Sequence, residues 1–157
     1  MNIHEGVKLA ALLLVTLALG MVQAQTRPNL NGTWKMDPAK SDFGSGPVSA
    51  SRLDRITYEE PNFKDTITQR LNGPENTYDM IYTTDGKECT NKVRGNVVNS
   101  TARWEGAELV IDSTVHALRQ QKTLDRYALS ADGKTLILHR HMTGHFDTDQ
   151  KIVFDRQ

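Results

Sequence analysis

The chain has 157 residues and a formal net charge of zero, because 19 lysines and arginines balance 19 aspartates and glutamates. This balance gives no electrostatic reason to expect a nucleic acid or an anionic membrane as a partner. The length predicts one domain, and the single cysteine, Cys89, excludes an internal disulfide framework. With 38% hydrophobic residues, the composition also excludes a collagen-like chain and a highly charged disordered tail.

The chain begins with a segment that has the features of a secretory signal peptide. Lys8 precedes an apolar run over residues 9–19, and Val22-Gln23-Ala24 forms a small-residue cleavage site. The apolar run is shorter than the about 20 residues that a membrane-spanning helix needs. We therefore predict a signal peptide over residues 1–24 and a mature domain over residues 25–157. The mature protein is expected to be secreted or periplasmic, without a transmembrane segment.

The rest of the sequence alternates short extended runs with turns. The runs are rich in Thr, Val, Ile and Tyr, and Asp-Gly turns at residues 85–86 and 132–133 favour tight hairpins. A helical period is absent, except for one possible helical turn over residues 37–42, where Asp37 suits a cap and Pro38 a first helical position. The expected strands are Leu30–Met36, Arg52–Glu60, Phe63–Leu71, Thr77–Thr84, a short Glu88–Lys92, Val97–Trp104, Leu109–His116, Lys122–Leu129, Thr135–Met142 and Lys151–Asp155.

These strands predict an all-β fold, namely an up-and-down antiparallel β-barrel of eight to ten strands. Short hairpin links favour a closed barrel, which also removes exposed sheet edges. An open sandwich is the alternative fold. The only long connection spans residues 37–51, and its part over residues 41–51 is rich in Gly, Ser and Pro. That loop is either a plain surface connection or a cover across the barrel mouth.

The first strand carries Gly32-Thr33-Trp34, which resembles the Gly-x-Trp motif of the lipocalin and calycin superfamily. The resemblance implies that Trp34 closes the barrel floor and that Arg156, at the end of the last strand, packs across it. The superfamily's middle motif, Thr-Asp-Tyr, is absent. The sequence also resembles small secreted bacterial lipocalin-like proteins, a likeness that implies the fold but transfers little function. The segments that carry this second likeness are Gly32–Asp42, Tyr82–Glu88 and Trp104–Gly106.

A barrel of about eight strands is wide enough to hold one small ligand. Alternation places Tyr78, Met80 and Tyr82 on one face of their strand, where they either fill the core or line a pocket. The modest apolar content favours a pocket, so we predict non-covalent binding of a small, partly hydrophobic or amphipathic ligand, without chemistry and without a cofactor. The predicted ligand-binding residues are Tyr78, Met80, Tyr82, Arg103, Trp104, Arg126, Tyr127 and Arg140.

Arginines inside the predicted strands are candidates for orienting a polar end of the ligand. Arg140 alternates with Leu138 and Met142, so it shares a face with apolar residues. A buried guanidinium without a partner costs several kcal/mol. Arg140 therefore either pairs with a carboxylate of the protein or awaits an acidic headgroup.

Two other functions compete with ligand binding. One is a structural or interaction module of the cell envelope, with a filled core. The other is a metal-dependent protein, because His139 and His141 share a strand face and His145 follows nearby. The sequence contains no Gly-x-Ser-x-Gly, His-Glu-x-x-His or phosphate-binding glycine motif, so no catalytic residue is predicted.

Overall fold

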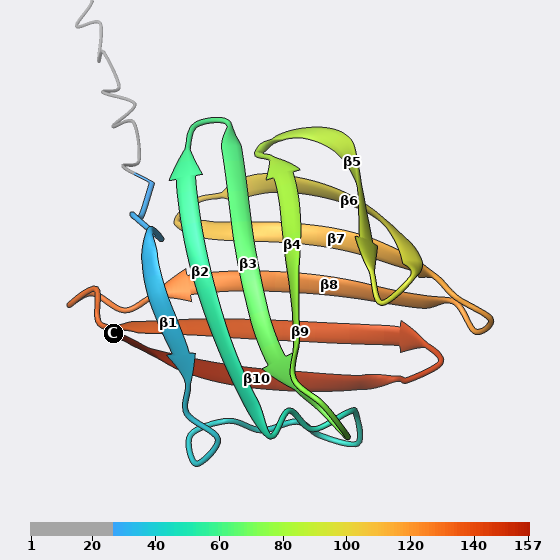
Figure 1. The fold of residues 1–157 in the computed structure, drawn as a ribbon. Coiled ribbons are helices and arrows are strands. Elements are labelled where there is room, and N and C mark those ends of the chain that lie inside the picture. Colours follow the sequence, from blue (N-terminus) through green and yellow to red (C-terminus); the bar gives the residue numbers. More distant parts are fainter. Residues whose placement is uncertain (1–26) are drawn as a thin grey trace, which may run out of the picture.

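The computed structural model describes residues 27–157, and the predicted signal peptide lies outside the described residues. The described part of the chain folds into antiparallel strands and contains no helix (Figure 1). None of its elements is a helix that is long and apolar enough to cross a membrane. The strands are β1 (Gly32–Met36), β2 (Ser51–Glu59), β3 (Asn62–Arg70), β4 (Asn76–Thr83), β5 (Asp85–Val93), β6 (Asn96–Glu105), β7 (Glu108–His116), β8 (Gln121–Leu129), β9 (Thr135–Gly144) and β10 (Thr148–Arg156).

The predicted strands and barrel are confirmed, with boundaries that differ by a few residues. The largest differences are in β5, predicted from Glu88 and observed to begin at Asp85, and in β10, predicted from Lys151 and observed to begin at Thr148. The helical turn considered after β1 is a hydrogen-bonded turn instead, in which the Asp37 carboxylate accepts a bond of 2.9 Å from the backbone amide of Ala39. A short polar side chain at this position satisfies the backbone without a helix.

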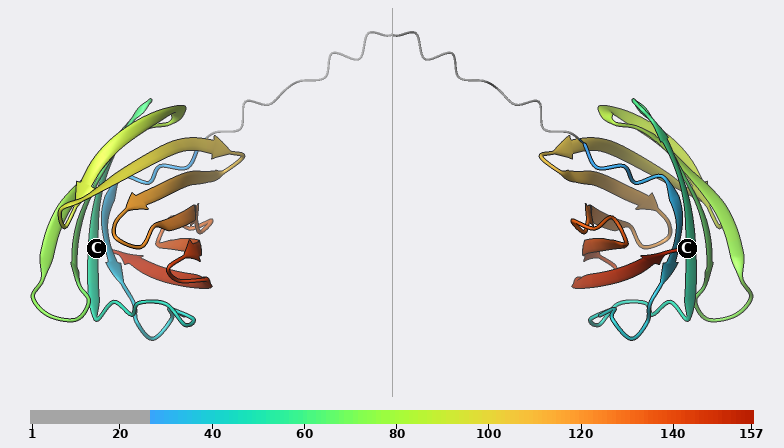
Figure 2. Two further views of the ribbon diagram at one scale, coloured as in Figure 1. Left: turned by 90° about the vertical axis from the view of Figure 1, so that its right-hand side faces the viewer. Right: turned by 90° about the vertical axis from the view of Figure 1, so that its left-hand side faces the viewer.

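All ten strands belong to one sheet, in the order β4-β3-β2-β1-β10-β9-β8-β7-β6-β5. Strand β1 pairs with both β2 and β10, so the first and last strands of the chain lie side by side. The sheet folds over on itself, and β1 to β4 cross β6 to β10 at a steep angle (Figure 1). Seen from the side, the two layers face each other across the core (Figure 2). This arrangement is a nearly closed barrel.

The two end strands of the sheet, β4 and β5, have no backbone ladder between them. The side chain of Asn91 bridges part of this gap, because its amide pairs with both backbone groups of Ile81. The Ile81 amide donates to Asn91 Oδ1, and Asn91 Nδ2 donates to the Ile81 carbonyl, each at 2.9 Å. One buried amide thus replaces a pair of ladder bonds, since it carries the same donor and acceptor as a peptide group.

The predicted pair at the barrel floor is confirmed. Trp34 is fully buried, lies opposite Arg156 in the β1–β10 pair, and has the guanidinium carbon 4.2 Å from its ring centroid. The guanidinium also donates to the carbonyls of Asn31 and Gly133 at 2.7 and 2.8 Å. Gly32 has a φ of 138°, and a Cβ there would lie 2.8 Å from Arg156 Nη1. The glycine of the motif therefore makes room for the arginine.

Candidate functional site

A cavity of about 240 Å³ lies inside the barrel, with lining side chains from strands β2 to β9. Its apolar wall includes Ile67, Met80, Val98, Val115 and Met142. These residues point inward because they occupy alternate positions of their strands, in phase with other buried residues. The barrel is therefore hollow between its two layers. A lining that mixes apolar side chains with a few polar groups is typical of small-molecule sites.

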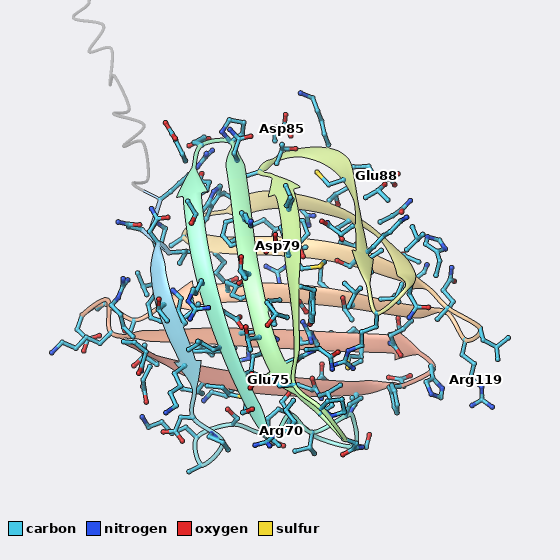
Figure 3. All side chains as sticks on the ribbon, in the orientation of Figure 1. Arg70, Glu75, Asp79, Asp85, Glu88 and Arg119 are labelled. Carbon is cyan, nitrogen blue, oxygen red and sulfur yellow. The ribbon has the colours of Figure 1, made fainter. Side chains whose placement is uncertain are left out.

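Five of the eight predicted ligand-binding residues line this cavity. Tyr78, Met80 and Tyr82 face inward from β4, while Tyr127 faces inward from β8 and Arg140 from β9. The intervening residues of β4 face outward, as Asp79 shows (Figure 3). The alternation predicted from the sequence thus places these five side chains together. Ligand binding by them stays a prediction.

Two arginines inside the barrel are each held by an aspartate in a two-bond pair. Arg52 donates to both carboxylate oxygens of Asp54, each at 2.8 Å. Arg140 donates to both oxygens of Asp125, at 2.7 and 2.6 Å, across the β8–β9 pair. This fork geometry is the strong form of a charged hydrogen bond. Of the two alternatives for Arg140, pairing with a carboxylate of the protein is the one observed.

A third carboxyl group, that of Asp65 on β3, is buried beside the first pair. Asp65 is 2% exposed, and its Oδ1 has no hydrogen-bond partner among the described residues. Burial raises the pKa of Asp65 well above its usual range, the negative charge of Asp54 raises it further, and Arg52 opposes both effects. The structure therefore favours the protonated form of Asp65 up to a higher pH than is usual for an aspartate.

Three tyrosines add neutral polar groups to the cavity. Burial raises the pKa of Tyr78, of Tyr82 and of Tyr127, so all three stay protonated. The Tyr78 hydroxyl accepts a bond of 2.7 Å from the side chain of Gln69. The hydroxyls of Tyr82 and Tyr127 have no such bond to another described residue. Buried hydroxyls usually have a hydrogen-bond partner, so these two can serve a ligand.

Two predicted ligand-binding residues, Arg103 and Arg126, do not line this cavity, and ligand binding by them stays a prediction. Arg103 donates to Glu105 at 2.9 and 2.6 Å, and Arg126 donates to Glu105 at 2.8 Å and to Glu108 at 3.3 Å. Both arginines flank Val110 in the sheet register, and Val110 is fully buried although it faces outward. Their stems cover this valine while their charged ends reach water.

Trp104, also predicted to bind the ligand, packs in an aromatic cluster beyond the cavity lining. Its indole N–H donates to the Tyr58 hydroxyl at 3.0 Å, and the two ring centroids lie 5.8 Å apart. Tyr58 and Tyr82 each lie 6.0 Å from Phe63 by the same measure. Trp104 faces inward as predicted, but it lies at the end of β6, so it contributes to closing one end of the barrel.

The loop between β1 and β2 covers a second, smaller cavity of about 120 Å³. Phe43 and Pro47 from the loop line it together with Arg52 and Arg140, which also line the main cavity. The side chain of Gln150 on β10 donates to the carbonyls of Phe43 and Pro47 at 3.0 and 3.3 Å. Of the two alternatives for this loop, the structure shows a cover, and hydrogen bonds attach it to the barrel.

The outer part of the main cavity reaches the turn between β5 and β6. Arg94 and Gly95 form this two-residue turn with φ angles of 50° and 81°. Positive φ at both positions suits the hairpin twist, and glycine accepts it without strain. Arg94 is exposed and also belongs to the cavity lining. A ligand that enters the cavity beside the β5–β6 turn would therefore pass the positively charged side chain of Arg94.

The histidines considered for metal binding do not gather into a site. His139 and His141 are exposed on the outer face of β9, and His141 lies 2.8 Å from Asp149. His145 packs against Phe146 with ring centroids 4.3 Å apart. Over residues 27–157, no group of three or more His, Cys, Asp or Glu side chains is arranged to hold a metal. Cys89 is half-buried, with its sulfur 3.7 Å from the Thr83 hydroxyl.

The interior residues that sequence reasoning missed are Arg52, Asp54, Asp65 and Asp125. A signal for them was present, because each is in phase with inward apolar residues of its own strand. Asp65, for example, alternates with Phe63 and Ile67, which are both buried. Charged residues at core positions are rare unless they are paired, so this pattern indicates a polar interior.

Compared by sequence, the chain matches no family model and no curated protein. Compared by structure, it is similar to a secretory abundant heat soluble protein of Ramazzottius varieornatus, with a TM-score of 0.62 and 13% identity over 85% of this chain and 98% of that one. Lipid binding protein 8 of Caenorhabditis elegans matches with a TM-score of 0.57 and 9% identity, covering 81% and 94% of the two chains. Human cRBP IV matches with a TM-score of 0.54 and 16% identity, covering 83% and 99%.

These similarities establish the fold. The chain has the antiparallel barrel fold of these proteins, the lipocalin-like fold that the Gly-x-Trp motif implied. Because fewer than about one residue in six is identical, the similarities establish the arrangement of the strands but not the residues of a binding site.

Proposed function

We propose that the protein is an exported binding protein, secreted or periplasmic, that holds a small, partly hydrophobic ligand in the barrel cavity without chemical change. The observation that carries this proposal is the cavity of about 240 Å³, whose apolar wall is combined with a few buried polar groups. The printed name of one structural neighbour, a lipid binding protein, supports the same kind of ligand. A filled core, the alternative, would leave no such space.

A pair of adjacent valines on β6 provides a direct test. Val98 is 3% exposed and lines the cavity, whereas Val97 is 37% exposed and faces outward. The substitution Val98→Phe is expected to fill part of the cavity and to abolish binding, while Val97→Phe is expected to leave binding intact. Melting temperatures of both variants would establish that they fold, because an oversized core residue typically costs 1–3 kcal/mol.

Native mass spectrometry of gently purified protein gives the readout. We expect a discrete organic adduct on the wild type and on Val97→Phe, and its loss from Val98→Phe. An adduct that survives Val98→Phe would show that the ligand lies elsewhere. A bare wild-type protein that also fails to bind added small apolar compounds would contradict the proposal.

The exported location rests on the first 24 residues and has its own test. When the full-length chain is expressed in a bacterial host with a periplasm, we expect the protein to be released by osmotic shock. Sequencing its N-terminus should begin at Gln25, the residue after the predicted cleavage site. Recovery of an uncleaved chain from the cytoplasm would contradict the proposed location.

A further inference from the structure

The charges inside the barrel are already balanced by the protein. Arg52 is paired with Asp54 and Arg140 with Asp125, both with two hydrogen bonds, and all four side chains are buried or nearly so. With a neutral Asp65, the interior has no net charge. With an ionised Asp65, it is negative, but Asp65 does not belong to the cavity lining and offers no direct partner to a cationic ligand. In neither state does the interior hold an uncompensated positive charge for an anionic ligand.

A carboxylate entering this cavity would have to compete with an internal aspartate for each arginine. Burying an ionised group without a counter-charge is costly, and removing a paired aspartate from its arginine is costly as well. Arg94 is the remaining cation of the lining, but it is exposed. Water and salt screen its charge, so it cannot replace a buried counter-ion.

The polar groups of the lining that remain available to a ligand are neutral hydroxyls and guanidinium N–H donors whose charge is already balanced by an aspartate. Tyr82 and Tyr127 carry hydroxyls that can both donate and accept, and neither bonds another described residue. The Nη1 atoms of Arg52 and Arg140 take no part in the two ion pairs and can still donate. A ligand hydroxyl can accept from a guanidinium N–H and donate to a tyrosine oxygen without adding charge.

The size of the cavity indicates how large a ligand, or part of a ligand, it can enclose. A cavity of about 150 Å³ in another protein holds one benzene molecule. By proportion, about 240 Å³ accommodates roughly ten non-hydrogen atoms. An eight-carbon chain with one polar end has this size.

On the basis of the proposed function, we propose that the cavity selects an uncharged ligand of about this size that carries a hydroxyl or a similar hydrogen-bonding end, and that it discriminates against carboxylates and ammonium ions. The paired arginines act as polar walls and not as an anion site. The selectivity follows from Asp125 and Asp54, which occupy the positions that a ligand carboxylate would otherwise take.

Three matched probes test this selectivity: octanol, octanoate and octylamine, titrated into the wild-type protein near neutral pH by calorimetry or ligand-observed NMR. We expect octanol to bind with a dissociation constant about tenfold or more below those of the two charged probes, because only they bring an uncompensated charge into the barrel. This comparison needs no variant, so it does not depend on how a substitution folds.

A change of interior charge tests the stated cause. Asp125→Asn removes the counter-ion of Arg140, so octanoate should gain at least tenfold in affinity relative to octanol. Asp112→Asn, an exposed position on β7, is the matched control and should leave the ratio of the two dissociation constants unchanged. If Asp125→Asn does not fold, the double variant Asp125→Asn with Arg140→Gln keeps the interior neutral and should retain the preference for octanol.

The outcomes separate this inference from the proposed function. Tighter binding of octanoate or octylamine than of octanol by the wild type would overturn the neutral-ligand inference and leave a binding barrel. If folded Asp125→Asn had the same ratio of octanoate to octanol affinity as the wild type, the pairing of Arg140 with Asp125 would not be the cause of the selectivity. Binding of none of the three probes, together with a bare mass of the purified protein, would overturn the proposed function itself.

Discussion

Asp65→Asn tests whether the barrel contains a neutral carboxylic acid. The asparagine side chain has nearly the same shape as the protonated acid and can donate to Asp54 in the same way, but it does not titrate. Asp65 is 2% exposed, and one of its oxygens has no partner among the described residues. Burial first, and then the charge of Asp54, raise its pKa in the folded state. The unfolded chain has the ordinary value of about 3.9.

The sign of the effect follows from linkage. A carboxyl group whose pKa is higher in the folded state than in the unfolded state binds its proton more tightly when folded. Its contribution to stability is therefore complete below about pH 4 and is lost as the pH rises toward the folded pKa. Within that window, each pH unit lowers the free energy of unfolding of the wild type by about 1.4 kcal/mol relative to Asp65→Asn. Above the folded pKa, the difference is constant.

Urea denaturation of both proteins from about pH 4 to pH 9 measures this difference. We expect the stability of Asp65→Asn to rise above that of the wild type as the pH increases. Asp79→Asn is the contrasting control, because Asp79 is exposed and its hydrogen bond with Lys64 lowers its pKa (Figure 3). Replacing it should act in the opposite direction, with stability lost mainly near neutral pH. Parallel stability curves for the wild type and Asp65→Asn would refute the neutral acid.

Three further substitutions test the packing of the barrel, each measured by urea denaturation. Trp34→Ala should lower the free energy of unfolding by about 3–5 kcal/mol, because a fully buried indole and its contact with Arg156 are lost, and an unchanged midpoint would contradict its place in the floor. Gly32→Ala should cost more than Gly73→Ala, because only the first added Cβ meets another side chain although both glycines have positive φ; equal costs would exclude the predicted clash. Asn91→Leu should cost about 1–3 kcal/mol by leaving two backbone groups of β4 unpaired, and a neutral result would show that the bridge is dispensable.

The order and extent of the strands could be predicted from the sequence because each strand carries its own signal. Alternation marks the strands locally, and the Asp-Gly turn at residues 132–133 marks the hairpin of β8 and β9. The hairpin predicted at Asp85-Gly86 is wrong, because these residues lie inside β5, which does not pair with β4. The pairing of the other neighbours follows from short links. The place of Trp34 against Arg156 came from the motif and from the closure of a barrel, which brings the first and last strands together. These features need no knowledge of distant side chains.

The cavity lining was predicted only in part, and the differences have a common cause. Arg103 and Arg126 were included because they are arginines within strands, although most residues in phase with Arg103, such as Asn99 and Thr101, are polar and indicate an outward face. Arg52 and Asp65 were missed although they are in phase with apolar residues. The phase of a residue indicates which side of a strand it faces, whereas its chemical type does not.

Of the two interior ion pairs, one follows from the strand pattern and the other does not. Arg52 and Asp54 are two residues apart on one strand face, which alternation does bring together. The pairing of Arg140 with Asp125, in contrast, depends on the register of β8 against β9, and a shift by one residue would separate them. Register is fixed by the whole hairpin, so a sequence without aligned relatives leaves it open.

The paired charges in the barrel also connect stability with the proposed function. Replacing a buried ion pair by well-packed apolar residues often leaves the free energy of unfolding unchanged or raises it. Apolar residues could therefore fill this core with equal or greater stability. Apolar residues of similar volume at Arg52 and Asp54 would be expected to retain the fold. They would also remove hydrogen-bond donors from the cavity wall. The interior keeps charged side chains and neutralises them internally, and the hydroxyls of Tyr82 and Tyr127 bond no other described residue. Such an interior suits the proposed orienting of a polar group of a ligand better than it suits stabilising the barrel.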